Sequence, residues 1–362
     1  MREHELRGVP PEWGDTVQRD RHVRANELHD PVSVRAARRA HKSPLGCRGF
    51  APFAALVLSV LGSLLPEPRV AEARRASDSW AGSAPAERAV TGGIVTLRSP
   101  GALMIRIPGG TFRMGSTAAE LVEAVVDCTR EPLGKDCDES RFADELPLHP
   151  VSLSSFFLDQ TEVTVEAYRR CVAARRCDPV PFDEGARRFD VARNPVVLVT
   201  WDDARRYCEF RGARLPTEAE FERAMRGLSG RRYPWGNLYN SRVSNHGRLG
   251  IDWSDARDGF TELAPVGAFP AGRTPDGFLD LAGNVAEWVL DRYMPGYRDG
   301  PATNPVGPSA PPAGSERVVR GGSYRSAAPW LRSAARWREE ALERLPYVGF
   351  RCAKSFIRRT TP

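Results

Sequence analysis

The chain has 362 residues, of which 41% are hydrophobic and 27% charged, and its formal net charge is +6. This apolar fraction is large enough for a hydrophobic core and excludes a chain that is disordered throughout. The 32 Gly and 30 Pro residues exceed their usual combined share of about 12%, which favours a loop-rich fold over a helical bundle. Basic and acidic residues are interleaved, so we expect no nucleic-acid partner.

The N-terminal part has the pattern of an export leader. Residues 1–48 are a polar, Arg-rich extension, and residues 49–65 are a run of seventeen uncharged residues. The small residues of Val-Ala-Glu-Ala at 70–73 have the spacing of an export cleavage site. The pattern predicts a signal peptide over 49–73, and the alternative is a membrane anchor through 49–65. In both cases we expect an exported protein, in the periplasm or at the cell surface.

Cysteine usage points to the same compartment. Cys47 precedes the apolar run, and six further cysteines follow it. An even number of cysteines beyond an export signal is typical of three disulfides, for which fifteen pairings exist. The short spacings Cys128/Cys137 and Cys171/Cys177 predict two local loop disulfides. Neither pair has the closer CxxC spacing of a zinc site.

Composition and periodicity divide the rest of the chain. Residues 74–100 are rich in Ala, Ser and Gly, and we expect a linker that runs into a first strand. Residues 101–356 read as one domain. Two β-like runs flank the Pro-Gly-Gly turn within 104–114, and residues 151–159 are another strand candidate.

Two helices carry clear start signals. One begins after Thr200, where two aspartates precede apolar residues at helical spacing, and one begins at the capping box Thr217-Glu-Ala-Glu and ends at Gly227. Beyond Gly227 we expect little regular structure until Val318, with a Pro/Gly-rich surface loop over 296–316.

Eight motifs occur in a fixed order: IPGGTFRMGS, LHPVSLSSFFLDQTEVT, PVVLVTWDDARRYCEF, ARLPTEAEFERAMRG, YPWGN, DLAGNVAEW, RVVRGGSY and VGFRC. In this order they closely resemble the formylglycine-generating enzyme (sulfatase-modifying factor) family over about residues 102–355. The resemblance implies that family's fold, a single compact α+β domain of low regular secondary structure related to C-type lectins. It also implies a disulfide between Cys208 and Cys352.

The segment that carries the family's chemistry differs here. In the authentic enzymes two cysteines after the GGSY motif bind copper and oxidise a substrate cysteine to formylglycine. Ser326 lies at the first of these positions and Leu331 at or near the second, and no cysteine lies between Gly321 and Phe350. Because Cu(I) selects soft sulfur ligands, we expect neither copper nor cysteine oxidation by the family's route.

Other branches of the family offer different chemistry. The sulfoxide synthases bind iron through three histidines, whereas only His149 and His246 follow the leader here. The exported enzyme that tailors the pyoverdine chromophore lacks the cysteine pair, as this chain does. Of these branches, it is the one whose function we expect this chain to resemble most. We therefore expect an exported tailoring enzyme of unassigned reaction.

The resemblance also implies two structural calcium sites built from hard oxygen donors. The first site would use Asn245, the His246 carbonyl, Asp258 and the Phe260 carbonyl, and the second would use Asp280, the Gly283 and Val285 carbonyls and Glu287. The alternative is that Asp258 and Glu287 cap turns or pair with arginine.

The alternative function is a non-catalytic binding module, because C-type-lectin-related folds present a variable surface on a rigid core. Its binding face would include Arg325, Trp330 and Arg332, residue types that are favoured in binding hot spots. A partly apolar pocket near Tyr324–Trp330 favours the enzyme, and a flat exposed Arg/Trp surface favours the binding module. The sequence names no protein, peptide or small-molecule partner.

Overall fold

The computed structural model describes residues 87–91, 94–99, 102–183, 185–249, 256–308 and 316–356. The chain divides into two units, Met1–Arg75 and Ala76–Pro362, and every described residue lies in the second. The expected leader and apolar run therefore lie outside the described residues. Within the described part, no helix is both long enough and apolar enough to cross a membrane.

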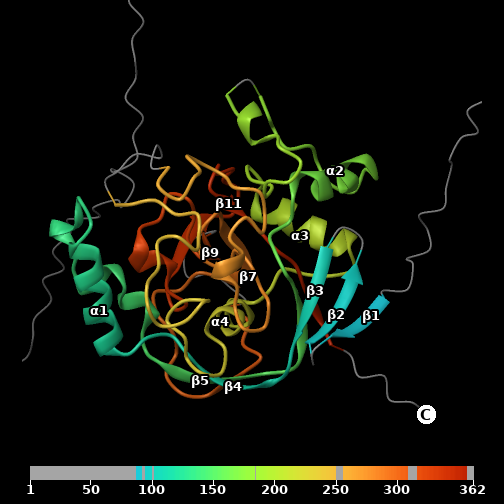
Figure 1. Cartoon of the computed structure of the whole chain (residues 1–362). Helices are drawn as coiled ribbons and strands as arrows, with labels where there is room; N and C mark the ends of the chain where they lie inside the picture. Colours follow the sequence, from blue (N-terminus) through green and yellow to red (C-terminus); the bar gives the residue numbers. More distant parts are fainter. Residues whose placement is uncertain are drawn as a thin grey trace, which may run out of the picture. The chain divides into compact units, whose positions relative to one another are not determined.

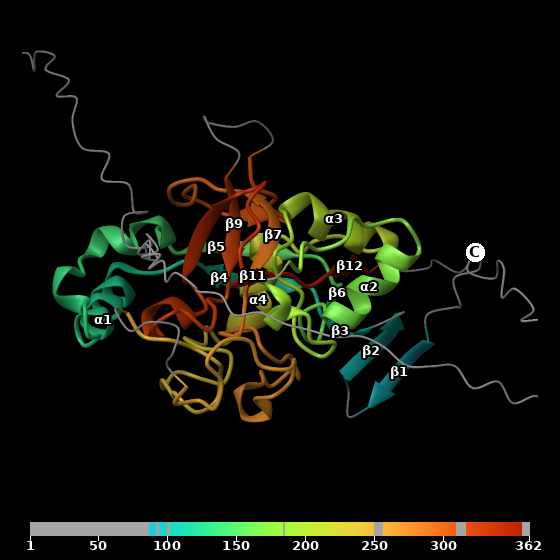
Figure 2. The ribbon, with the colours of Figure 1, turned by 90° about the horizontal axis from the view of Figure 1, so that it is seen from above.

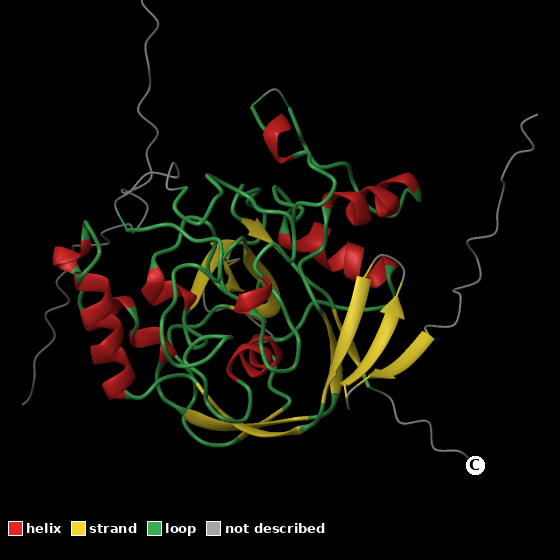
Figure 3. Cartoon of the chain, viewed as in Figure 1, coloured by secondary structure: helices red, strands yellow, loops and turns green. Residues whose placement is uncertain are grey.

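Short elements connected by long loops make up the described domain (Figure 3). The α-helices are α1 (Ala118–Thr129), α2 (Val165–Ala173), α3 (Trp201–Phe210) and α4 (Glu218–Arg226). Single 3₁₀ turns are η2 (Gly134–Asp136), η3 (Glu139–Arg141), η4 (Ala143–Glu145), η5 (Arg187–Phe189), η6 (Pro270–Gly272) and η7 (Ala328–Leu331).

The strands form three sheets. One has the order β1 (Glu87–Thr91), β2 (Ile94–Ser99), β3 (Ala102–Ile107), β6 (Phe156–Asp159) and β12 (Ala353–Ser355). A second has the order β10 (Arg336–Glu340), β9 (Glu316–Arg320), β7 (Ala286–Arg292) and β11 (Val348–Gly349). The third has the order β4 (Gly110–Met114), β5 (His149–Leu153) and β8 (Ala302–Thr303).

Helix α4 occupies the centre of the domain, with β4 and β5 on one side and β7 and β9 on the other (Figures 1 and 2). All of its residues are buried. Phe221 and Met225 belong to the largest core cluster, together with Val289 of β7 and Val318 of β9. The helix therefore ties the three-stranded and four-stranded sheets to one core.

Buried ion pairs hold two acidic residues of α4, Glu218 and Glu222. Glu218 accepts two hydrogen bonds from Arg336, at 2.8 and 2.9 Å, and Glu222 accepts one from Arg320 at 2.7 Å. Burial alone would raise the pKa of Glu218, but Arg336 and Arg320 hold that pKa below its usual value. Removing one partner of such a pair leaves an uncompensated buried charge and typically costs about 3–5 kcal/mol.

The structure confirms both expected helices. Thr200 and Thr217 each accept a hydrogen bond from the backbone three residues later, which completes the capping boxes of α3 and α4. The expected strand over 151–159 is two strands, because β5 and β6 belong to different sheets. Strands β1 and β2 lie within the expected linker 74–100, and they extend the sheet by pairing onto β3.

The sequence analysis did not predict helices α1 and α2 or strand β7. Strand β7 lies in the region where little regular structure was expected. Its residues are nearly all buried, including Glu287 and Asp291. Because both faces of the strand are covered, it lacks the polar/apolar alternation that marks a half-exposed strand.

All three disulfides that the sequence analysis predicted are present. Cys128 pairs with Cys137 and Cys171 with Cys177, as the short spacings indicated. The third bond joins Cys208 of α3 to Cys352 beside β12, across 144 residues of sequence, with their Cα atoms 5.5 Å apart. It connects the chain's C-terminal end to α3, and such bonds are typical of exported proteins.

We predict that replacing Cys208 and Cys352 by alanine destabilises the protein about twice as much as replacing Cys171 and Cys177. In the chain-entropy model, the long loop is worth about 5 kcal/mol and the short loop about 2 kcal/mol. Urea unfolding of the two double variants measures the difference. Equal losses, or alkylation of Cys208 in the unreduced parent protein, would contradict this assignment.

Candidate functional site

The segment from the end of β9 through η7 contains the positions at which the family's active cysteines would lie. It begins with Gly321 and Gly322, whose φ angles are +89° and +69°. A Cβ atom on Gly322 would lie 2.9 Å from the Trp330 carbonyl oxygen and 3.0 Å from the side chain of Leu331. The double glycine therefore lets the chain turn back closely against η7.

The two residues at the expected active positions, Ser326 and Leu331, bond to the backbone and pack into the core, respectively. The Ser326 hydroxyl accepts a hydrogen bond from the Ser323 backbone N–H at 2.9 Å, and the Ser326 carbonyl accepts one from Gly247 at 3.0 Å. Leu331 is fully buried in the main core cluster. Within the described residues, no imidazole, thiol or carboxylate bonds to the Ser326 hydroxyl, so this geometry forms no activated nucleophile.

The expected Arg/Trp binding face is not a continuous surface. Arg332 lies in the interior, 3% exposed, where it forms hydrogen bonds of 2.8 and 2.6 Å to the two carboxylate oxygens of Glu145. Its placement on a binding surface is therefore corrected, because the guanidinium is already paired and buried. Trp330 is half-buried against Phe142, and Arg325 is half-buried over the Tyr347 ring.

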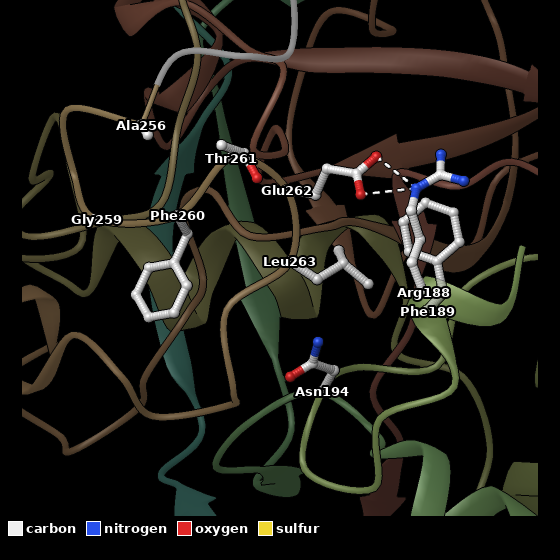
Figure 4. A pocket seen from close by; sticks show the side chains of 9 residues that line it. All are labelled: Arg188, Phe189, Asn194, Ala256, Gly259, Phe260, Thr261, Glu262 and Leu263. Carbon is white, nitrogen blue, oxygen red and sulfur yellow. Dashed lines mark hydrogen bonds and ion pairs between the residues drawn. The ribbon is translucent and has the colours of Figure 1, made fainter.

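A pocket of about 310 Å³ opens between two loops close to this segment (Figure 4). Arg188 and Glu262 form one wall through hydrogen bonds of 3.0 and 2.8 Å. The Phe260 ring lies on the side opposite this ion pair, and Asn194 lies below Leu263 with its amide turned toward it. The remaining lining residues are Phe189, Ala256, Gly259 and Thr261.

Asn194 is the unusual polar group of the pocket. It is 7% exposed, and its side-chain oxygen has no hydrogen-bond partner among the described residues. A buried acceptor without a donor costs about 1–3 kcal/mol. The side-chain oxygen of Asn194 is thus a buried acceptor in the pocket lining without a donor among the described residues.

The pocket rests directly on the expected active segment. Phe189 and Leu263 of its lining pack in one apolar cluster with Tyr324, the residue that follows Ser323. Burial raises the pKa of Tyr324 to about 12, and the negative charge of Glu262 acts in the same direction. The pocket therefore adjoins the start of the segment, and neither Ser326 nor Trp330 lines it.

The first expected calcium site is a set of neighbouring oxygen atoms. Asp258 accepts hydrogen bonds from the His246 and Phe260 backbone N–H groups at 2.8 and 3.0 Å. Asn245 donates its amide hydrogens to the Glu262 carbonyl and to Asn284, which turns its side-chain oxygen the other way. That oxygen is buried and has no partner among the described residues. The two bonds of Asp258 are those of the turn-capping alternative, and the unpaired Asn245 oxygen is the feature that suits a hard cation.

The second expected calcium site contains a surplus of buried acid. Both oxygens of Glu287 contact Arg351, at 2.7 to 3.0 Å, as the arginine alternative for this residue anticipated. Asp280 accepts from the Gly267 N–H at 2.6 Å. Glu162, which the sequence analysis missed, is buried nearby with one oxygen unpaired. Among the described side chains, no three His, Cys, Asp or Glu residues converge as metal ligands.

Burial raises the pKa of each of these three carboxyl groups. For Glu162, the neighbouring charges of Asp280 and Glu287 raise the pKa further, and Arg351 opposes them. One guanidinium thus faces three acids. The Gly283 and Val285 carbonyls, the other expected ligands, belong to the turn that leads into β7.

Most pocket residues were not predicted from the sequence. Arg188, Phe189 and Asn194 come from the loop after α2, and Glu262 and Leu263 come from a loop about seventy residues later. No motif spans both loops, so only the fold brings them together. Glu162 did carry a signal, since it stands in the quoted motif that ends in Thr-Glu-Val-Thr.

Comparisons with known proteins agree with this geometry. A family model described as "Sulfatase-modifying factor enzyme 1-like domain" matches residues 95–356. The chain is 31% identical over 306 residues to a formylglycine-generating enzyme of Thermomonospora curvata, a match that covers 69% of this chain and 92% of that protein. It is 36% identical over 230 residues to the serine/threonine-protein kinase Pkn1 of Chlamydia trachomatis.

The match to Pkn1 covers 58% of this chain and 35% of that protein, so the chain spans about a third of the kinase's length. Among solved structures, PvdO from Pseudomonas aeruginosa aligns with a TM-score of 0.55 and 24% identity, over 72% of this chain and all of that one. This likeness shows the fold: a single compact α+β domain of the formylglycine-generating-enzyme and C-type-lectin type. The chain therefore belongs to the sulfatase-modifying factor (formylglycine-generating enzyme) family.

Proposed function

We propose that this chain is an exported tailoring enzyme of the family that takes a small aromatic amine or amide in the pocket beside Tyr324. The observation that carries the proposal is the unpaired Asn194 acceptor in the lining of a pocket that packs against the family's active segment. Export is supported by the three disulfides and by the leader pattern of residues 49–73.

The pocket lining indicates the class of substrate. Asn194 offers a carbonyl oxygen to an N–H or O–H donor, and Phe260 presents a half-buried ring. Arg188 and Glu262 neutralise each other, so the wall favours neither sign of charge. These features fit a small aromatic amine or amide, whose ring packs on Phe260 while its N–H reaches Asn194.

The second candidate function, a non-catalytic binding module, is favoured by a different observation. The hydroxyls of Ser323 and Ser326 both accept backbone hydrogen bonds within the same turn. A segment built this way braces the pocket and supplies no nucleophile. The two functions share the binding step and differ in whether the ligand is changed.

We predict that Asn194→Leu abolishes binding of small aromatic amines without lowering the melting temperature of the free protein. Leucine has nearly the same shape and removes a buried acceptor that has no protein partner, so the fold loses no hydrogen bond. Thermal-shift titrations with tyramine and tyrosinamide measure the response. Asn240→Leu, at an exposed position, is the matched control and should respond as the parent protein does.

A parent protein that responds to neither compound, or an Asn194→Leu variant that responds fully, would remove the support for the pocket. Mass spectrometry of the bound compound after incubation then separates the two functions. A change of its mass supports the enzyme, and an unchanged mass supports the binding module.

We further predict that the protein does not convert cysteine to formylglycine in a sulfatase-type peptide, even with copper and a thiol reductant. The family route needs two thiolates for Cu(I), and residues 321–350 contain none. Ser326→Cys should remain inactive, because a single thiolate leaves the site incomplete. Mass spectrometry of the peptide detects the aldehyde. Its appearance with the parent protein would overturn the prediction.

We also propose structural calcium, held at the first site by Asn245, Asp258 and the His246 and Phe260 carbonyls. The unpaired Asn245 oxygen supports this proposal. A Ca²⁺ ion there would cross-link two loops of a region with little regular structure. The second site would use Asp280, the Gly283 and Val285 carbonyls and Glu287. Arg351 already contacts Glu287 there, and the remaining surplus of acid supports a cation.

Calcium in excess should therefore raise the melting temperature above that measured in chelator. Binding at a hundred times Kd stabilises the native state by about 2.7 kcal/mol. Asp258→Asn should reduce this response, and the exposed Asp299→Asn should not. Glu287→Ala is a poorer test, because it leaves the buried Arg351 without its carboxylate partner whether or not calcium binds. Identical melting curves of the parent protein in calcium and in chelator would refute the proposal.

A further inference from the structure

Arg223 differs from the other deeply buried arginines of the domain. Each of Arg211, Arg320, Arg332, Arg336 and Arg351 contacts at least one carboxylate within 3.2 Å. Arg223 is 5% exposed, and among the described residues no carboxylate lies within ion-pair distance of it and no hydrogen bond reaches its side chain. Its Nε atom is buried and unpaired, as are those of Arg211 and Arg320, so the lack of a carboxylate contact is what sets Arg223 apart. A buried guanidinium without a counter-charge is costly, and the described residues place no carboxylate against this one.

A second arginine lies on the same side of α4. Gly227 follows Arg223 by four residues, which places the two positions one above the other on one helix face. The Arg231 guanidinium packs over Gly227, where an added Cβ would lie 2.4 Å from its Nη1 atom. Arg231 donates one hydrogen bond to the Met225 carbonyl at 3.0 Å, and its Nε atom is also buried and unpaired.

One acid acts on this pair. Asp276 attracts both guanidinium groups electrostatically, and among the described residues it lies within ion-pair distance of neither. Burial lowers the pKa of Arg223 and of Arg231, Asp276 opposes that effect, and Arg231 lowers the pKa of Arg223 further. Two positive charges therefore face one negative charge. Arg231 and Asp276 are half-exposed, which leaves a route from solvent.

We infer that Arg223 and Arg231 form a binding site for a small oxyanion, such as phosphate, sulfate or a carboxylate, at the C-terminal end of α4. The paired guanidinium groups supply charge-assisted N–H donors in the fork geometry that oxyanions accept. The anion would satisfy the two unpaired Nε atoms and supply the missing negative charge. This site is separate from the pocket beside Tyr324, since the two share no residue.

Titration calorimetry of the protein with inorganic phosphate, at constant ionic strength, tests this inference. We expect Arg223→Met to weaken phosphate binding by at least about tenfold, because it removes the buried donor. The exposed Arg206→Met is the matched control and should bind phosphate as the parent protein does. Without phosphate, Arg223→Met should melt no lower than the parent, because it removes an uncompensated buried charge.

A second variant keeps the test decisive if Arg223→Met fails to fold. Asp276→Asn should tighten phosphate binding several-fold, since it removes the carboxylate that competes for the arginines. Parallel titrations with sulfate and acetate distinguish a tetrahedral oxyanion from a carboxylate, and binding of either supports the site. Absence of binding by all three anions, equal binding to the parent and Arg223→Met, or weaker binding to Asp276→Asn would overturn it.

Discussion

The ion pairs between α4 and the second sheet are the constraint on which the rest of the domain depends. Charges on a helix that is buried on every side are costly unless they are paired, and Glu218 and Glu222 are paired with Arg320 and Arg336. Arg320 ends β9 and Arg336 begins β10, so these contacts fix both ends of the segment between the strands. Arg332, paired with Glu145, fixes its middle. The candidate site is therefore built on a segment held at three points by buried charge.

The sequence predicted those parts of the fold that are decided locally. Helices α3 and α4 were found because a capping threonine and an acid three residues later satisfy the first turn without help from the rest of the chain. Helix α1 has the same signal in Thr117 and Glu120, although the sequence analysis did not predict it. Strand β7 gave no such signal, because its environment is supplied on both faces by distant segments.

The candidate site was predictable in residue type and not in arrangement. A sequence shows that Glu287 and Asp280 are acidic, but not that Arg351 reaches the first from the far end of the chain. It shows arginines near residue 330, but not that Arg332 turns inward to Glu145. The pocket is a clearer case, since Asn194 and Glu262 lie on loops that share no motif. Long-range pairing decided each of these outcomes.

The buried ion pairs of Arg320, Arg332 and Arg336 also explain how this chain keeps the family's fold without the family's cysteine pair. None of the ion pairs that fix the segment uses position 326 or 331, and Leu331 packs into the core as an ordinary apolar residue. The turn at Gly321–Gly322 is set by backbone freedom and the close approach of η7. The scaffold and the chemistry are thus held by different residues. A loop fixed from outside can change its reactive side chains while the pocket beside it keeps its shape.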